Sequence, residues 1–138
     1  MAKDIIHEAA KQALINSGWT ITHDPFYLKF FGKDLNIDLG AERLIGAEKG
    51  TERIAVEIKS FINTSMVYDY HLALGQYLNY MLALQRNAPD RILYLAITLY
   101  AYNAFFIDDD VQYSLAYNKI NLIVFDENTM QITYILNH

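Results

Sequence analysis

Three ionisable residues in two short apolar segments have the types and spacing to hold a divalent cation. Glu57 and Lys59 lie in residues 54–61, where β-branched and aliphatic residues predict a β-strand. Successive side chains of a strand point to opposite faces, so Glu57 and Lys59 share one face. Asp38 lies in a similar apolar run, residues 35–40. If the two strands pair, two carboxylates and a lysine meet at one end of a sheet, which suits Mg²⁺ or Mn²⁺.

Such a site could hydrolyse a phosphodiester. A cation there would polarise a phosphate and lower the pKa of a bound water. Lys59 could orient that water and offset the charge that builds on the phosphate. The alternative is an ion pair between Glu57 and Lys59 on a half-exposed sheet, with Asp38 ending a strand. Glu42 and Glu48 are acids nearby, and either could be a third carboxylate or a solvated one.

Two further polar residues, Gln76 and Tyr80, lie in the helix predicted after these strands. They are four residues apart and therefore share one face of that helix. Together the residues resemble the PD-(D/E)xK nuclease superfamily, and especially its branches with a Gln-x-x-x-Tyr helix. The motif residues, in order, are Asp38, Glu57-x-Lys59 and Gln76-x-x-x-Tyr80. Ile37 stands where the name of the motif has proline, a departure common in that superfamily.

The resemblance implies a fold, a metal and residue roles. The fold is α/β and restriction-endonuclease-like, with an α-β-β-β-α-β core and a mixed central sheet flanked by helices. The implied metal ligands are Asp38 and Glu57, and the implied catalytic residues are Asp38, Glu57, Lys59 and Gln76. Gln76 would position the site or the phosphate. Tyr80 is an additional candidate, for which the polar edge of an amphipathic helix is an equal explanation.

An acid on the first helix reaches the metal in many of the resembled enzymes, which makes Glu8 a further candidate. A solvated Glu8 beside its i+3 neighbour Lys11 is the simpler interpretation, and we favour it. His7 has no partner at a ligand spacing and is expected at the surface.

Longer matching blocks run through most of the chain and resemble the XisH family. They are residues 18–25, 37–42, 47–50, 54–61, 73–77 and 90–96. That family comprises controlling factors for excision of the fdxN element in filamentous cyanobacteria. The resemblance implies a role in site-specific DNA rearrangement. The implied partners are DNA and a second small protein of the XisI type.

The pattern of elements fits one domain over residues 1–138. Helices are expected over residues 4–17, after a Ser65 or Thr64 cap up to about residues 87–90, and over 100–118 in two pieces. Strands are expected over 19–23, 26–31, 35–39, 43–48 and 54–61, forming an antiparallel meander that ends at Glu57 and Lys59. Residues 91–98 form a nearly continuous apolar strand, and residues 121–125 and 131–136 predict a closing hairpin.

Composition excludes several classes of protein. The chain has 138 residues and no Cys, which rules out disulfides and thiolate zinc sites. Its beginning does not match a signal peptide, and no apolar run is long enough to span a membrane, so a cytoplasmic protein is expected. The net charge of −5 argues against strong unaided DNA binding. Eleven Tyr and seven Phe indicate a core and an oligomer interface, for instance of a homodimer.

Two functional hypotheses follow. The first is a Mg²⁺- or Mn²⁺-dependent endonuclease acting on DNA. The second is a catalytically silent nuclease-fold module that regulates a recombinase by binding a partner protein, which the acidic charge and the aromatic content favour.

Overall fold

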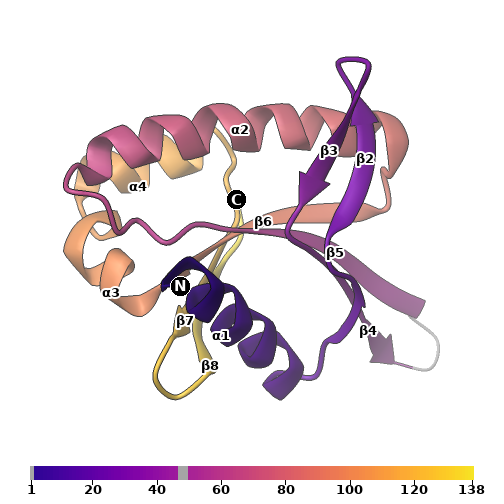
Figure 1. Ribbon diagram of the computed structural model, residues 1–138, viewed down its shortest axis with the longest axis horizontal. Coiled ribbons are helices and arrows are strands. Elements are labelled where there is room, and N and C mark those ends of the chain that lie inside the picture. The colour runs from indigo at the N-terminus through magenta and orange to yellow at the C-terminus, as the bar shows by residue number, and fades with distance from the viewer. Residues whose placement is uncertain (1, 47–49) are drawn as a thin grey trace.

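A mixed six-stranded sheet carries helices on both faces in the computed structural model of this chain (Figure 1), which describes residues 2–46 and 50–138. Its strand order is β1-β4-β5-β6-β7-β8, and β2 and β3 form a separate two-stranded hairpin. The β5–β6 and β6–β7 pairs are parallel, and the other pairs are antiparallel. The elements are α1 (Ala2–Asn16), β1 (Thr20–His23), β2 (Phe26–Phe30), β3 (Lys33–Ile37), β4 (Leu39–Gly46), β5 (Gly50–Ile58), α2 (Met66–Asn87), β6 (Arg91–Thr98), α3 (Leu99–Ala101), the π-helical turn η1 (Tyr102–Phe106), α4 (Asp109–Tyr117), β7 (Leu122–Asp126) and β8 (Gln131–Leu136).

Two apolar layers hold the sheet, one on each face. Alternate residues of β5 divide between them, with Val56 packing on the α1 side and Ala55 on the α2 side. This is the period of two that a strand imposes. It confirms that Glu57 and Lys59, in register with Ala55, face away from Val56 and Ile58. β6 is buried on both faces from Leu93 to Thr98, as its continuous apolar run predicts.

The long helix α2 begins and ends as expected. Ser65 caps it, because its Oγ accepts a hydrogen bond from the backbone N–H of Tyr68 at 3.2 Å. Asp108 caps α4 in the same way, so the acidic run after η1 begins a helix. None of the helices within residues 2–46 and 50–138 is long and apolar enough to cross a membrane.

A buried tyrosine ties α2 to the sheet. The Tyr77 hydroxyl donates to the carbonyl of Leu93 at 2.8 Å and accepts from the backbone N–H of Asn121 at 3.0 Å. Tyr77→Phe removes both bonds, so we expect it to lower the free energy of unfolding by about 1–3 kcal/mol. Urea denaturation measures this, with Tyr113→Phe at an exposed tyrosine as the matched control. Equal stabilities of the two variants would contradict the expectation.

The predicted antiparallel meander is wrong in several respects. Residues 35–39 do not form one strand, because the chain bends at Asp38 between β3 and β4. β3 pairs only with β2, whereas β4 enters the main sheet between β1 and β5. The chain therefore changes from one sheet to the other at the bend at Asp38. The turn expected at residues 49–52 is also displaced, since Gly50, Thr51 and Glu52 begin β5; Lys49 lies outside the described residues.

Candidate functional site

Asp38 and Glu57 lie opposite each other where β4 meets β5. Leu39 pairs with Val56, and continuing this antiparallel register brings Asp38 to Glu57. Two hydrogen bonds fix the pair. The backbone N–H of Asp38 donates to Glu57 Oε1 at 3.2 Å, and the backbone N–H of Ile58 donates to Asp38 Oδ2 at 2.8 Å. Each carboxylate therefore keeps one oxygen outside this pair of bonds.

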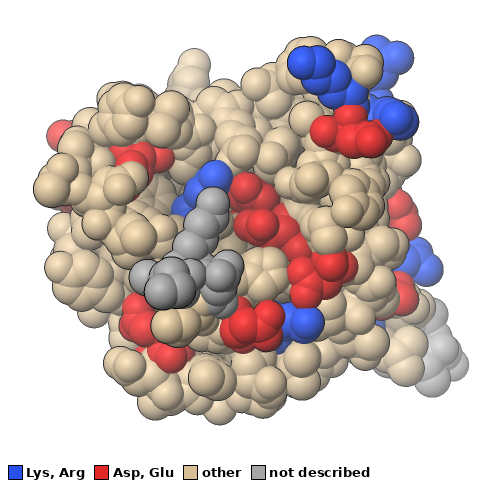
Figure 2. Space-filling model, in the orientation of Figure 1, with Lys and Arg blue, Asp and Glu red and all other residues tan. Residues whose placement is uncertain are grey.

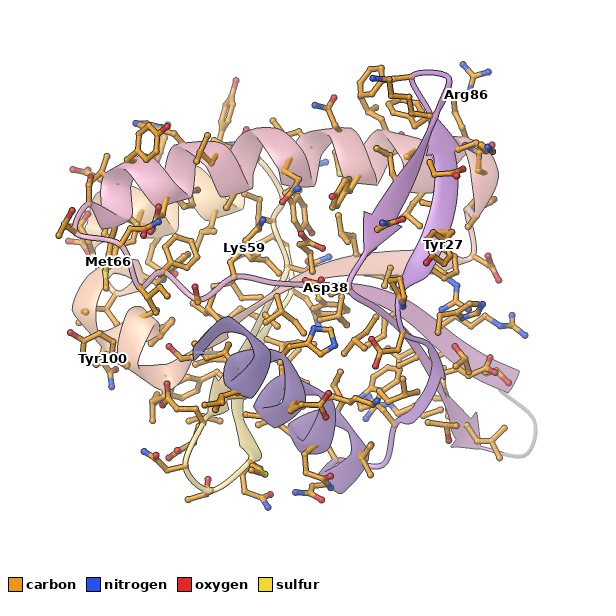
Figure 3. The ribbon with its side chains drawn as sticks, in the orientation of Figure 1. Tyr27, Asp38, Lys59, Met66, Arg86 and Tyr100 are labelled. Carbon is orange, nitrogen blue, oxygen red and sulfur yellow. The ribbon has the colours of Figure 1, made fainter. Side chains whose placement is uncertain are left out.

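Lys59 completes a cluster of three charged groups just beyond the end of β5. Its Nζ lies 3.4 Å from Glu57 Oε2. Its backbone N–H donates to the carbonyl of Ala96 at 3.0 Å, which continues the pairing of β5 with β6 by one residue. In Figure 3 the labels of Asp38 and Lys59 lie in the space between α1 and α2. The expectation that Asp38, Glu57 and Lys59 lie together is confirmed, whereas their catalytic and metal-binding roles stay predictions.

The carboxyl of Glu57 is buried, with only 6% of the residue exposed. Burial and, to a smaller degree, the negative charge of Asp38 raise the pKa of Glu57 to about 8, although Lys59 and the Asp38 N–H oppose the shift. The positive charge of Lys59 thus does not fully balance the two acids. A second positive charge at this position would favour the ionised form of Glu57.

A pocket of about 390 Å³ opens in front of these residues between α1 and α2. Acidic side chains gather in the middle of this view of the surface (Figure 2). The walls combine the charged cluster and further polar side chains from both helices with apolar ones. The lining residues are Ile6 and His7 from α1, Asp38, Glu57, Ile58 and Lys59 from the sheet, Ser60, Phe61, Ile62 and Asn63 from the following segment, and Asp69, Leu72 and Ala73 from α2.

Gln76 and Tyr80 lie beside this site rather than in the pocket wall. Gln76 Nε2 donates to the Tyr80 hydroxyl at 2.9 Å, and that hydroxyl donates to the carbonyl of Asn36 at 3.3 Å. Burial and the negative charges of Glu57 and Asp38 together raise the pKa of Tyr80 to about 12. Within the described residues, the buried Oε1 of Gln76 accepts no hydrogen bond. The Gln76–Tyr80 pair thus contacts the chain close to Asp38 from outside the pocket. The Oε1 atom of Gln76 remains an unused acceptor among the described residues.

The further acids considered from the sequence lie elsewhere or outside the described residues. Glu8 is exposed on α1 and does not line the pocket. Glu42 pairs with Arg53, with 3.0 Å between Oε2 and Nε, which explains it without a metal. Glu48 lies outside the described residues.

Two residues of the pocket wall were not predicted from the sequence. His7, expected at the surface, lines the pocket from α1, and its Nε2 lies 3.1 Å from Oδ1 of Asp24. Asp69 lines the opposite wall, with Oδ1 accepting from Asn63 Nδ2 at 2.9 Å and Oδ2 buried without a partner among the described residues. Spacing could have identified Asp69, because positions 69, 73, 76 and 80 recur on one helix face.

The carboxylate oxygens of the site suit a hard divalent cation that takes only one or two of its ligands from the protein. In the part of the chain that the structure describes, no three His, Cys, Asp or Glu side chains are placed to hold a metal ion together. Mg²⁺ is commonly held by one or two carboxylates while waters and substrate phosphates fill the other positions. Asp38 and Glu57 beside an open pocket meet that requirement, whereas a fully protein-coordinated site would need more ligands.

Comparison with known proteins places the chain in a family. A family described as XisH protein matches residues 1–133. The structure of an XisH family protein from Nostoc punctiforme PCC 73102 is 38% identical with a TM-score of 0.86, over 97% of this chain and 100% of that one. An fdxN element excision controlling factor protein from Anabaena variabilis is 38% identical with a TM-score of 0.87, over 97% and 99%. No protein with a curated description matches. Since the match covers almost the whole sequence, the chain belongs to the XisH family.

Proposed function

We propose that this protein is a metal-dependent endonuclease of the restriction-endonuclease-like, PD-(D/E)xK type that takes part in controlling the excision of a DNA element. The observation that carries the proposal is the convergence of Asp38, Glu57 and Lys59 in the wall of one pocket. The order of elements supports the core, since α1 is followed by the antiparallel strands β1, β4 and β5, then by α2 and β6. The 38% identical Anabaena variabilis protein, described as an fdxN element excision controlling factor, supports the biological role.

Each residue of the site has its own role in the proposed hydrolysis of the phosphodiester, according to where it lies. Mg²⁺ or Mn²⁺ held by Asp38 and Glu57 would polarise the scissile phosphate and acidify a bound water. The backbone N–H groups of Asp38 and Ile58 each hold one oxygen of the two carboxylates, which fixes both groups beside each other. Lys59 orients the attacking water and stabilises the negative charge that develops on the phosphate. Gln76 and Tyr80 hold the end of β3 and thereby position Asp38, the next residue after that strand.

Cleavage of DNA tests the proposal directly. Wild-type protein is incubated with single-stranded, duplex and branched DNA in Mn²⁺ or Mg²⁺, with and without an XisI-type partner, beside Glu57→Gln. We expect metal-dependent cleavage by wild type and none by Glu57→Gln. The XisI-type arm is needed because the net charge of −5 disfavours tight DNA binding by the chain alone. Cleavage that persists in Glu57→Gln would assign it to another site or a contaminant.

A second candidate is a silent nuclease-fold module that regulates a recombinase through a partner protein. The ion pair of Lys59 with Glu57 Oε2 favours it, because the lysine occupies the oxygen that a metal would need. The two candidates differ in metal binding. The nuclease predicts a rise in melting temperature with Mn²⁺ that Asp38→Asn removes, whereas the module predicts no rise in either protein.

A further inference from the structure

The β2–β3 hairpin projects from the body of the protein past the C-terminal end of α2 (Figure 1). Its inner face is apolar and packs on α2, with Phe26, Leu28 and Ile37 buried. At its outer end, Asn87 Nδ2 of α2 donates to the carbonyl of Lys29 at 2.9 Å. The hairpin is therefore held along its length, and its outer face and tip are free to contact another molecule. We call this hairpin the arm.

An exposed aromatic residue occupies the tip in an unfavourable conformation. Phe30 pairs with Lys33, so the turn has the two residues Phe31 and Gly32, with φ of 56° and 67°. Two positive φ angles are typical of a type I′ turn, in which asparagine is strongly preferred at the first position. Phenylalanine there is disfavoured and is 67% exposed, so core packing does not account for it. The ring touches that of Phe30, with 4.5 Å between the ring centroids, and the exposed remainder is open to a contact outside the chain.

Cationic side chains surround this ring in an otherwise acidic protein. Lys29 and Lys33 flank the turn of the arm, Arg86 lies beside it on α2, and a pocket there is lined by Lys29, Phe31 and Arg86 among others. Figure 2 shows Lys and Arg gathered over this corner, and Figure 3 labels Arg86 beside the tip. Asp34 is the acid of the group and pairs with Lys29 at 2.7 Å. Among the described residues, no carboxylate pairs with Lys33 or Arg86.

A second exposed aromatic ring extends the surface. Tyr27 is 63% exposed and lies two residues before Lys29, on the same face of β2. On the outer face of β2 a ring and a cation thus lie next to each other at Tyr27 and Lys29, and the exposed ring of Phe31 follows in the turn at the end of the strand. Aromatic platforms alternating with cations are typical of surfaces that bind single-stranded nucleic acid, where bases stack and cations neutralise phosphates.

We propose that the arm binds single-stranded DNA, with bases stacked on Phe31 and Tyr27 and phosphates beside Lys29, Lys33 and Arg86. The inference rests on the proposed function only for the choice of DNA over RNA. β3 leads from the tip straight to Asp38, and at about 3.3 Å per residue the tip lies roughly 20 Å from that carboxylate. A strand gripped by the arm would run within a few nucleotides of the pocket.

Binding is measured by the fluorescence anisotropy of a labelled oligothymidine at low salt and in EDTA, so that no metal-dependent cleavage contributes. Three phosphate contacts predict a slope of about −2 in log K against log salt concentration. The double variant Lys33→Gln, Arg86→Gln should reduce this slope to about −0.7 and weaken binding. Asp34→Asn should strengthen binding, because it removes the carboxylate that pairs with Lys29. A slope unchanged in the double variant would overturn the proposal.

The variant Phe31→Asn removes the exposed ring without disturbing the fold, so it tests the contribution of the ring to DNA binding. Asparagine suits the type I′ turn, so the melting temperature should stay the same or rise. Loss of the stacked base should nevertheless weaken binding roughly 5- to 150-fold. Tyr117→Ala, at a 78% exposed tyrosine on α4, is the matched control and should bind as wild type does. Equal binding by Phe31→Asn and wild type would overturn the assignment.

Competitor molecules distinguish other occupants of the arm. Tighter binding of duplex DNA or of a uridine oligomer would overturn the choice of single-stranded DNA. A dimer that Phe31→Asn dissociates, without oligothymidine binding, would identify the arm as an interface between copies instead. Because binding is measured in EDTA, it is independent of metal-dependent cleavage. Loss of DNA binding by the arm with cleavage intact would contradict only this inference, and binding without cleavage would contradict only the proposed nuclease.

Discussion

Replacing Lys59 with methionine is expected to lower the rate of metal-dependent DNA cleavage by roughly 100- to 10,000-fold, the range for losing one group that transfers a proton or stabilises charge in the transition state. Methionine keeps the aliphatic length of lysine, and the backbone bond from residue 59 to Ala96 is retained. The fold should therefore be unchanged. Single-turnover cleavage of labelled DNA in saturating Mn²⁺ measures the effect.

Metal binding by the same variant identifies the cause of the loss. Lys59 Nζ lies 3.4 Å from Glu57 Oε2, where it competes with a cation for that oxygen. Lys59→Met should therefore bind Mn²⁺ as tightly as wild type or more tightly, measured by calorimetry. Lys119→Met, at an exposed lysine away from the pocket, is the control for cleavage. A variant that loses cleavage and Mn²⁺ binding together would assign Lys59 a structural role in place of a chemical one.

Glu57→Gln is expected to make the protein more stable than wild type at alkaline pH. Burial raises the pKa of Glu57 in the folded protein to about 8 from its usual 4.5, so the folded state binds the proton more tightly than the unfolded state does. The contribution of Glu57 to stability is complete below pH 4.5 and is lost as the pH rises through 8. Over this window the loss is up to about 5 kcal/mol. Glutamine avoids that loss because it does not ionise, and its carbonyl can still accept from the Asp38 N–H.

Urea denaturation of both proteins between pH 4.5 and 9 measures this difference. The advantage of Glu57→Gln should grow up to about pH 8 and then level off. A metal ion at the site should reverse the order, since a cation favours the ionised carboxyl of wild type. Mn²⁺ should thus stabilise wild type most above pH 8 and leave Glu57→Gln nearly unaffected. A stability difference that does not change with pH would mean that Glu57 is not protonated in the folded protein.

Local patterns in the sequence were sufficient for several features of the structure. The period of two in residues 54–61 placed Glu57 and Lys59 on one face, because side-chain direction along a strand depends only on neighbouring residues. Ser65 and the spacing after it predicted α2, since a cap and an amphipathic stripe are also local signals. The continuous apolar run of residues 91–98 predicted a strand covered on both faces.

Features that depend on distant segments needed the tertiary structure. The break at Asp38 arises because β3 pairs with β2 while β4 pairs with β1 and β5, and no local signal encodes that choice of partners. The entry of His7 and Asp69 into the pocket depends on how α1 and α2 pack on the sheet. The separate hairpin that we call the arm was also not predicted, since residues 26–31 indicated only another strand.

The sequence by itself determined which chemical groups this XisH family protein carries and in what order, including Asp38, Glu57, Lys59 and Gln76. Only the tertiary structure decided that Gln76 lies behind the site, that Glu8 and Glu42 lie away from it, and that Phe31 stands exposed among cations. The physical reason is that residue type and local periodicity are properties of neighbours along the chain. Burial, register and pKa are set by segments far apart in sequence, such as residues 38 and 57, that meet only in the folded protein.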